Sequence, residues 1–221
     1  MVAITISEGL KSRVPGLALG CVTAEVRSVA KHDEGLWHEI DAHLARLAAT
    51  HKADDIAALP QVAAMRAAYK ALGKEPSRYR GSAEALLRRV LSGKALYRIN
   101  SVVDINNLVS LESFQPLGSY DLTLLGPAIE LRIGAPGETY KGIGKEMINI
   151  ESLPVFADAT GAFGSPTSDS ERAMIRPESR RILMAIFSFI GPDGIERWMG
   201  RAVDLLRNHC NADGIQTKVV S

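Results

Sequence analysis

The stretch YRINSVVDINNLVSLESFQPLGSYD, residues 97–121, decides the fold expected for this chain. It predicts a helix that begins near Asn100, because apolar residues repeat from Ile105 onward at spacings of three and four. Asn100, Asp104 and Asn107 share another face of that helix. Since the helix has strongly apolar flanks, this polar stripe must be either solvated or hydrogen-bonded inside the protein.

Length and composition predict a globular protein with its own core. The chain has 221 residues, 46% of them hydrophobic, which is enough for one sizeable domain. No segment approaches the ~18 consecutive apolar residues that a membrane span needs. The N-terminal residues include charges where a secretory signal would be apolar. We therefore expect a cytoplasmic location and no membrane partner.

The cysteines and histidines offer no metal site. Cys21 and Cys210 are expected to be buried free thiols, and CxxC, HExxH and His-Cys clusters at ligand spacing are absent from the sequence. Neither a metal nor a cofactor is expected. All five histidines are expected at the surface: His32, His38, His43, His51 and His209.

Charge is unevenly distributed along the chain. The net charge of +1 argues against an indiscriminate nucleic-acid binder, because affinity for phosphate comes largely from clustered Lys and Arg. Residues 70–98 carry eight basic and two acidic side chains, a local net of +6, whereas the other 192 residues carry −5. This segment indicates a polyanionic partner, the alternative being solvated helix faces. The candidate contacts are Arg78, Arg80, Arg88 and Arg98.

Periodicity predicts a helical front part and a strand-richer back part. The predicted helices cover 35–51, the segment from Leu59-Pro60 to Gly73, 82–93, and the run from 194 or 195 to 208. The predicted strands cover 17–29, 128–133, 153–157, 173–175 and the apolar run 182–190. The loop 160–170, rich in Gly and hydroxyl side chains, could present backbone N–H groups to an oxyanion or phosphate, the alternative being a polar surface loop.

Residues in 97–121 resemble one known family. They match the pattern R-x-N-x-V-V-D-x-x-N followed by Q-P-x-x-x-(aromatic)-D of the B3/4 domain in the beta subunit of bacterial phenylalanyl-tRNA synthetase. The matching residues are Arg98, Asn100, Val102, Val103, Asp104, Asn107, Gln115, Pro116, Tyr120 and Asp121. The upstream run KALGKEPSRYRGSAEALLRRV resembles free-standing relatives of this domain, and the resemblance covers about residues 70–190.

The resemblance implies an α+β fold: a single three-layer domain with a β-sandwich-like core flanked by helices. Residues 1–75 would form an N-terminal strand and helical part packed on a core made by residues 76–221, one compact domain overall. In the synthetase this domain hydrolyses tyrosine wrongly esterified to the phenylalanine tRNA. The resemblance therefore implies a tRNA-binding module that could hydrolyse a mischarged aminoacyl-tRNA in trans.

Two positions of the family pattern differ in this sequence. Asn106 stands where the family has threonine, and Gly118 stands where it has histidine, while Asn107 is kept. The family's acidic residue that reads the tyrosine hydroxyl falls near Asp169 or Glu171. A glycine has no side chain with which to orient water, so no residue is assigned as catalytic. The expected lining of a substrate pocket is Asn106, Asn107, Gly118, Tyr120, Asp169 and Glu171.

Two further functions remain open at this point. The same pocket could bind a free amino acid or another small metabolite without catalysis, the tRNA surface having been lost with the histidine. A homodimeric scaffold is a third possibility, because Trp198 and Met199 lie on the apolar side of the last predicted helix, although core burial is the alternative for both.

Overall fold

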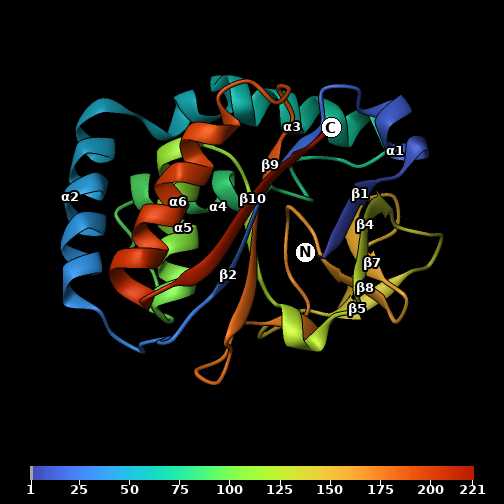
Figure 1. Cartoon of the computed structure of the whole chain (residues 1–221). Helices are drawn as coiled ribbons and strands as arrows, with labels where there is room; N and C mark the ends of the chain where they lie inside the picture. The colour runs from blue at the N-terminus through green and yellow to red at the C-terminus, as the bar shows by residue number, and fades with distance from the viewer. Residues whose placement is uncertain (1) are drawn as a thin grey trace.

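The computed structural model describes residues 2–221, which Figure 1 shows as a ribbon. The first half contains β1 (Ala3–Ile6), α1 (Glu8–Arg13), β2 (Ala18–Glu25), α2 (Glu34–Thr50), η1 (Ala53–Ala58), α3 (Pro60–Ala71), α4 (Ser82–Leu91) and α5 (Ser101–Ser113). The second half contains β3 (Leu117–Asp121), η2 (Leu122–Leu124), β4 (Ala128–Ile133), β5 (Thr139–Lys141), β6 (Met147–Asn149), β7 (Pro154–Asp158), β8 (Gly161–Gly164), η3 (Glu171–Ala173), β9 (Arg181–Ser188), α6 (Ile195–Cys210) and β10 (Asp213–Val220). None of the described helices is long and apolar enough to cross a membrane.

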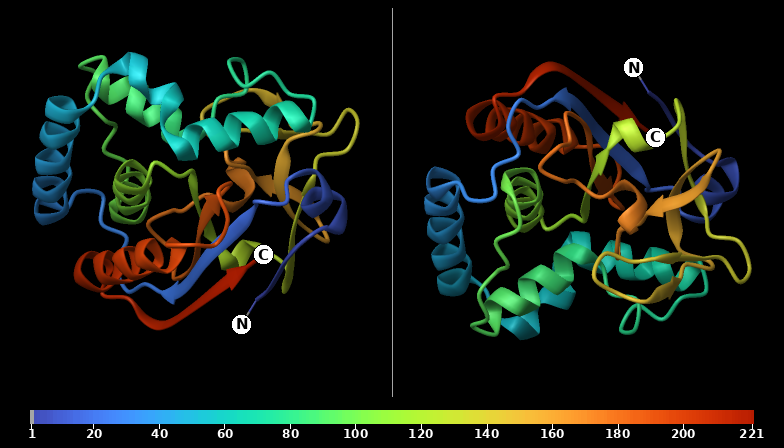
Figure 2. Two further views of the ribbon diagram at one scale, coloured as in Figure 1. Left: turned by 90° about the horizontal axis from the view of Figure 1, so that it is seen from above. Right: turned by 90° about the horizontal axis from the view of Figure 1, so that it is seen from below.

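Two sheets and a helical layer form three layers (Figure 1). The first sheet has the strand order β1-β4-β7-β8, and the second has the order β10-β2-β9-β3. Helices α5 and α6 pack on the outer face of the second sheet, with α2 and α4 beside them (Figures 1 and 2). Helix α3 contributes Met65, Ala68 and Tyr69 to the cluster between the two sheets. The expected α+β class with a sandwich-like core is confirmed.

Strand β9 shows why the second sheet is covered on both faces. Its side chains alternate between two apolar clusters, as a pleated strand requires. Those in the cluster with the helices are Ile182, Met184 and Ile186. Those in the cluster between the sheets are Leu183, Ala185 and Phe187. A continuous apolar run is thus what a central strand with two buried faces needs.

The polar stripe predicted on α5 is largely hydrogen-bonded inside the protein. Asn100 caps the helix, its Oδ1 accepting from the backbone N–H of Val103 at 3.0 Å. Asp104 is buried, and its two oxygens accept from Trp37 Nε1 at 2.8 Å and from the N–H of Ile99 at 3.1 Å. Burial raises the pKa of Asp104, while these hydrogen bonds oppose the rise. The stripe therefore anchors α2 to the start of α5.

The expected strand over 173–175 is wrong. Glu171–Ala173 forms a short 3-10 helix instead, whose first turn is capped by Ser170 Oγ accepting from the N–H of Arg172 at 3.2 Å. Strand β10 was not predicted at all. It is an edge strand with mostly exposed side chains, so its residues do not alternate between apolar and polar.

His209 corrects the expectation that every histidine lies at the surface. Its side chain is only 12% exposed and lies between two carboxylates. Nδ1 is 3.1 Å from Asp33 Oδ2, and Nε2 is 3.3 Å from Glu39 Oε1. The ring therefore ties the end of α6 to α2.

The two cysteines are buried free thiols, as expected. Cys21 belongs to the cluster between the sheets and Cys210 to the cluster under the helices, so the second sheet separates them. Burial raises the pKa of Cys21 to about 12 and that of Cys210 to about 11. Both therefore remain protonated and unreactive near neutral pH.

Tyr120 of β3 joins the two sheets. Its ring is fully buried and makes edge-to-face contacts with Phe156 and Phe163, at centroid distances of 5.8 and 5.1 Å. A Cβ atom at Gly118 would overlap the Tyr120 hydroxyl, and one at Gly164 would overlap its ring. The ring therefore needs a residue without a side chain at both positions.

We expect Gly118→Ala to lower the free energy of unfolding by about 1–3 kcal/mol, the usual cost of overpacking a close-packed core. The measurement is urea denaturation followed by circular dichroism. The matched control is Gly200→Ala in α6, where an added Cβ would meet nothing within 4 Å. Equal stability of the two variants would contradict the proposed role of Gly118.

Candidate functional site

A half-buried carboxyl group forms the centre of the candidate site. Asp169 Oδ1 accepts a hydrogen bond from the Tyr120 hydroxyl at 2.8 Å and another from the backbone N–H of Ser165 at 3.3 Å. Its second oxygen, Oδ2, makes no hydrogen bond within residues 2–221. Burial raises the pKa of Asp169 to about 7, although both hydrogen bonds act in the opposite direction. Burial and the adjacent Asp169 carboxyl also raise the pKa of Tyr120, which therefore stays a donor.

Two further tyrosines hold the turn that carries Asp169. The Tyr69 hydroxyl of α3 lies 2.8 Å from Thr167 Oγ1, and the Tyr140 hydroxyl of β5 donates to the carbonyl oxygen of Ser168. Lys145 Nζ donates to Ser168 Oγ at 2.9 Å. The turn is thus held from α3 and from the β5–β6 hairpin, two parts of the chain that are distant from each other in sequence.

This arrangement is suited to proton transfer. A carboxyl with a pKa near neutrality can accept and release a proton at physiological pH, as a general base or acid must. Tyr120 and Ser165 orient one oxygen of Asp169, and this leaves Oδ2 to accept from water or a ligand. Among residues 2–221, no group of three His, Cys, Asp or Glu side chains could hold a metal ion.

The structure divides the pocket residues predicted from the sequence between two faces of β3. Asn106 of α5 is buried on the helical side, where its Oδ1 accepts from the Ser119 hydroxyl at 2.9 Å. Gly118 and Tyr120 face the opposite way, into the space between the sheets. The second sheet therefore separates Asn106 from Tyr120.

The other predicted pocket residues divide in the same manner. Asp169 lies on the same side as Tyr120 and accepts a hydrogen bond from its hydroxyl. Asn107 is half-buried in α5, in the helical layer, and its side chain makes no hydrogen bond within the described residues. Glu171 is paired instead with Lys141, at 3.1 Å. The structure thus brings together Gly118, Tyr120 and Asp169 from the predicted set.

Two of the predicted nucleic-acid contacts surround one buried carboxylate. Glu84 is only 3% exposed, and its oxygens accept from Arg66 at 2.9 Å and from Arg88 Nε at 2.8 Å. Arg80 Nε lies 3.4 Å from Glu84 Oε1. Burial disfavours the charged form of Glu84, but the hydrogen bonds from Arg66 and Arg88 outweigh it and lower its pKa. Three guanidinium groups around one carboxylate leave a local excess of positive charge.

Two arginines beside this group lie over aromatic rings. The Arg89 guanidinium is 3.9 Å from the centroid of Tyr97, which is 65% exposed. The Arg98 guanidinium is 4.4 Å from the centroid of Trp37, whose ring is buried, and 3.4 Å from Glu34 Oε1. Arg89, Tyr97 and Arg98 are called the arginine–aromatic surface below.

The basic segment adjoins the turn that carries Asp169. Ser82, at the start of α4, donates its backbone N–H to the carbonyl of Pro166 at 2.8 Å. Arg80 lies two residues before that contact, and both Arg78 and Arg80 are exposed. The positive charges of Arg78 and Arg80 therefore lie near the turn that carries the Asp169 carboxyl.

Sequence reasoning missed several partners of these residues. The spacing of four between Arg80, Glu84 and Arg88 was a signal for ion pairs on one helix. The contact between Arg98 and Trp37 had no such signal, because the two residues are far apart in sequence and only the fold brings them together. The same is true of Tyr140 and its partner Ser168.

We expect the stability of this protein to depend on the titration of Asp169. The pKa of Asp169 in the folded protein, about 7, is above its value in the unfolded chain, so folding favours the protonated carboxyl. The stability that this group contributes is therefore fully present below about pH 4 and is lost as pH rises through 7. Asp169→Asn should remove this part of the pH dependence. Thermal unfolding from pH 4 to 8 measures it, and parallel profiles for the two proteins would contradict the assignment.

Comparisons with known proteins agree on one family. The B3/4 domain model matches residues 64–211. The phenylalanine–tRNA ligase beta subunit of Synechococcus sp. (strain JA-2-3B'a(2-13)) is 44% identical over 62 residues, which cover 25% of this chain and 8% of that protein. The corresponding subunit of Geobacter metallireducens (strain ATCC 53774 / DSM 7210 / GS-15) is 32% identical over 120 residues, 53% of this chain and 15% of that protein. The chain thus spans only a small part of the length of these relatives.

A solved structure shares the fold. The crystal structure of an N-terminal fragment of the phenylalanyl-tRNA synthetase beta-subunit from Pyrococcus horikoshii has a TM-score of 0.51 to this chain. The match covers 99% of this chain and 50% of that chain, at 13% sequence identity. Because the family model matches more than half of its residues, this chain belongs to the B3/4 domain family.

Proposed function

We propose that this chain is a tRNA-binding module, and the arginine–aromatic surface is the observation that carries the proposal. Tyr97 is exposed and is covered on one face by Arg89. Exposed aromatic rings next to guanidinium groups are the surface on which unpaired bases stack. The excess positive charge around Glu84 supplies contacts to phosphate beside it.

Family membership supports tRNA as the nucleic acid. The relatives that match are beta subunits of phenylalanine–tRNA ligases. A net charge of only +1 favours one localised interface over general binding to polyanions. The exposed Arg78 and Arg80 would place the RNA backbone next to the turn that carries Asp169.

We expect Tyr97→Ala to weaken tRNA binding by about 1–3 kcal/mol, because one stacked base loses its partner. Arg78→Ala and Arg80→Ala should also weaken binding and lower its salt dependence, by a slope of about 1 for each lost phosphate contact. Fluorescence anisotropy of labelled tRNA at several salt concentrations measures both quantities.

The matched control is Arg207→Ala, since Arg207 is an exposed arginine at the far end of α6. This control should bind as the unaltered protein does. Unchanged affinity and salt slope in the Tyr97, Arg78 and Arg80 variants would overturn the proposed interface.

Hydrolysis of an aminoacyl ester in trans is a second candidate function, and Asp169 is the observation that favours it. Its carboxyl has a pKa of about 7 and an oxygen that no other described group uses. In the proposed reaction, Asp169 takes a proton from water as the water oxygen attacks the ester carbonyl carbon. The bond to the ribose oxygen then breaks, and the proton passes to that oxygen. A free amino acid and an uncharged tRNA are the products.

The amino acid of such an ester is expected to differ from tyrosine. The family resemblance implies an acidic residue that reads a tyrosine hydroxyl, with Asp169 as one candidate. In this chain Tyr120 itself supplies a hydroxyl to Asp169 Oδ1. Since that oxygen already has its donor, a substrate phenol would have to compete with a fully buried side chain of the protein.

We expect the unaltered protein to deacylate at least one member of a panel of mischarged tRNAs, with little turnover of tyrosyl-tRNA. Asp169→Asn should lose this activity, because an amide does not accept the proton, and should keep its affinity for tRNA. Release of labelled amino acid measures turnover. Absence of turnover on the whole panel would refute hydrolysis and leave tRNA binding intact.

A further inference from the structure

The inner face of the second sheet changes from apolar to polar at one end. On β2, Leu19 and Cys21 are buried between the sheets, and Thr23 and Glu25 continue the same alternation outward. Thr23 lies opposite Gln216 of β10. Glu25 lies opposite Arg181 of β9 in the register. Four polar side chains thus share one face where an apolar core would be expected to continue.

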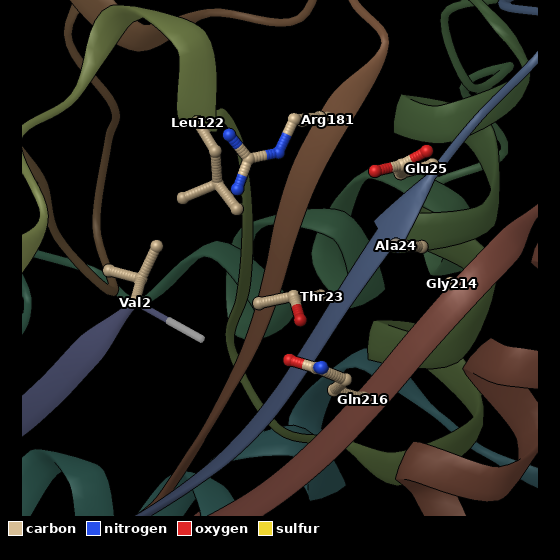
Figure 3. A pocket seen from close by; sticks show the side chains of 8 residues that line it. All are labelled: Val2, Thr23, Ala24, Glu25, Leu122, Arg181, Gly214 and Gln216. Carbon is tan, nitrogen blue, oxygen red and sulfur yellow. The ribbon is translucent and has the colours of Figure 1, made fainter.

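A cavity of about 140 Å³ lies at this end of the sandwich (Figure 3). The four polar side chains line it, and Val2 and Leu122 form its apolar wall. Figure 3 shows the Arg181 guanidinium extending toward Leu122, and the polar ends of Thr23 and Gln216 directed toward each other. Arg181 also borders two adjoining hollows. Cavities of roughly 150 Å³ accommodate a molecule the size of benzene.

The polar groups at this cavity have no partners among residues 2–221. Thr23, Glu25, Arg181 and Gln216 make no side-chain hydrogen bond there, and Glu25 and Arg181 form no ion pair although they are register partners. The neighbouring Arg180, by contrast, donates to two backbone carbonyls at 2.8 Å. The charges that line the cavity are therefore available to a ligand.

We propose that this cavity binds a small zwitterion of the amino-acid type, with its carboxylate on Arg181 and its ammonium group on Glu25. A guanidinium presents paired N–H donors that match the two oxygens of a carboxylate. Glu25 supplies the opposite charge for an ammonium group. Thr23 and Gln216 add neutral donors and acceptors, and Val2 and Leu122 favour a short side chain.

A zwitterion fits this charge distribution better than a simple anion does. An anion on Arg181 would lie near the unpaired carboxylate of Glu25, which repels it. A zwitterion places one of its charges on each side chain and leaves neither without a counter-charge. Asp169 does not line this cavity, and the proposal does not depend on tRNA binding.

The test is titration of the full chain with glycine, L-alanine, L-serine and L-valine, followed by ¹H–¹⁵N NMR. We expect shifts of the backbone amides of Thr23, Glu25, Arg181 and Gln216 with at least one of the four. L-Alaninamide, which lacks the carboxylate, and N-acetyl-L-alanine, which lacks the ammonium group, should each bind about tenfold more weakly than L-alanine or not at all.

Arg181→Gln and Glu25→Gln should each abolish the shifts, whereas Arg180→Gln should retain them. The side chains of Arg181 and Glu25 are exposed, so removing their charges should leave the variants folded, which thermal unfolding can show. The proposal is overturned if none of the four amino acids shifts these amides, or if N-acetyl-L-alanine binds as well as L-alanine. It is also overturned if either variant still binds. Arg181→Gln should bind tRNA with the same affinity as the unaltered protein. This measurement distinguishes the cavity from the proposed tRNA interface.

Discussion

The hydrogen bond from Tyr120 to Asp169 depends on a steric constraint that organises the space between the two sheets. The ring can reach Asp169 only because Gly118 and Gly164 leave room for it. Phe156 and Phe163 of the first sheet then pack against its faces and edges. One side chain of the second sheet therefore fixes both the packing between the sheets and the carboxyl that carries the proposed chemistry.

This constraint gives a physical reason for the glycine at the position where the resemblance implies a histidine in the family. Gly118 is required by the neighbour two residues along the strand, which lies on the same face and fills the volume that a side chain would take. A histidine could not be restored at 118 without moving the Tyr120 ring. A glycine at 118 is thus coupled to the hydroxyl that Tyr120 directs at Asp169, which supports the proposal that the chemistry of this site differs from that implied by the family pattern.

The sign of the local charge differs between two parts of the helical layer. Where α6 meets α2 and α5, carboxylates outnumber arginines, because Arg201 is shared by Glu39 and Glu112 and the His209 ring lies between Asp33 and Glu39. Around Glu84 the reverse holds, because three arginines share a single carboxylate. Arg88 of this group precedes Arg89 of the arginine–aromatic surface in the chain, and we therefore propose the tRNA interface there and not on α6.

Local patterns in the sequence predicted five of the helices and four of the strands, and the α+β class came from the family resemblance. The cap at Asn100, the apolar run of β9 and the glycine after α3 each act through neighbours a few residues away, so their effect can be predicted from spacing. No strand was predicted at 117–121, where Gly118 and Tyr120 were expected only as pocket residues, and nothing in the sequence indicated that a second glycine, Gly164, completes the space for the ring. The edge strand β10 and the 3-10 turn at Glu171 were not predictable, because neither has a periodic apolar pattern.

Only the tertiary structure decided which chemical groups meet. Tyr120 and Asp169 are 49 residues apart, and Trp37 and Asp104 are 67 apart, so no periodicity could connect them. The fold also separated residues that the family pattern placed together, since Asn106 and Tyr120 lie on opposite faces of one sheet. The sequence by itself indicated the family and, through the family resemblance, the layers, because the motif at 97–121 is a continuous segment; local periodicity placed the main helices and strands. The candidate site around Asp169 depended on how the two sheets pack. The side chains that meet there come from segments far apart in the sequence, so no single segment could predict their contacts.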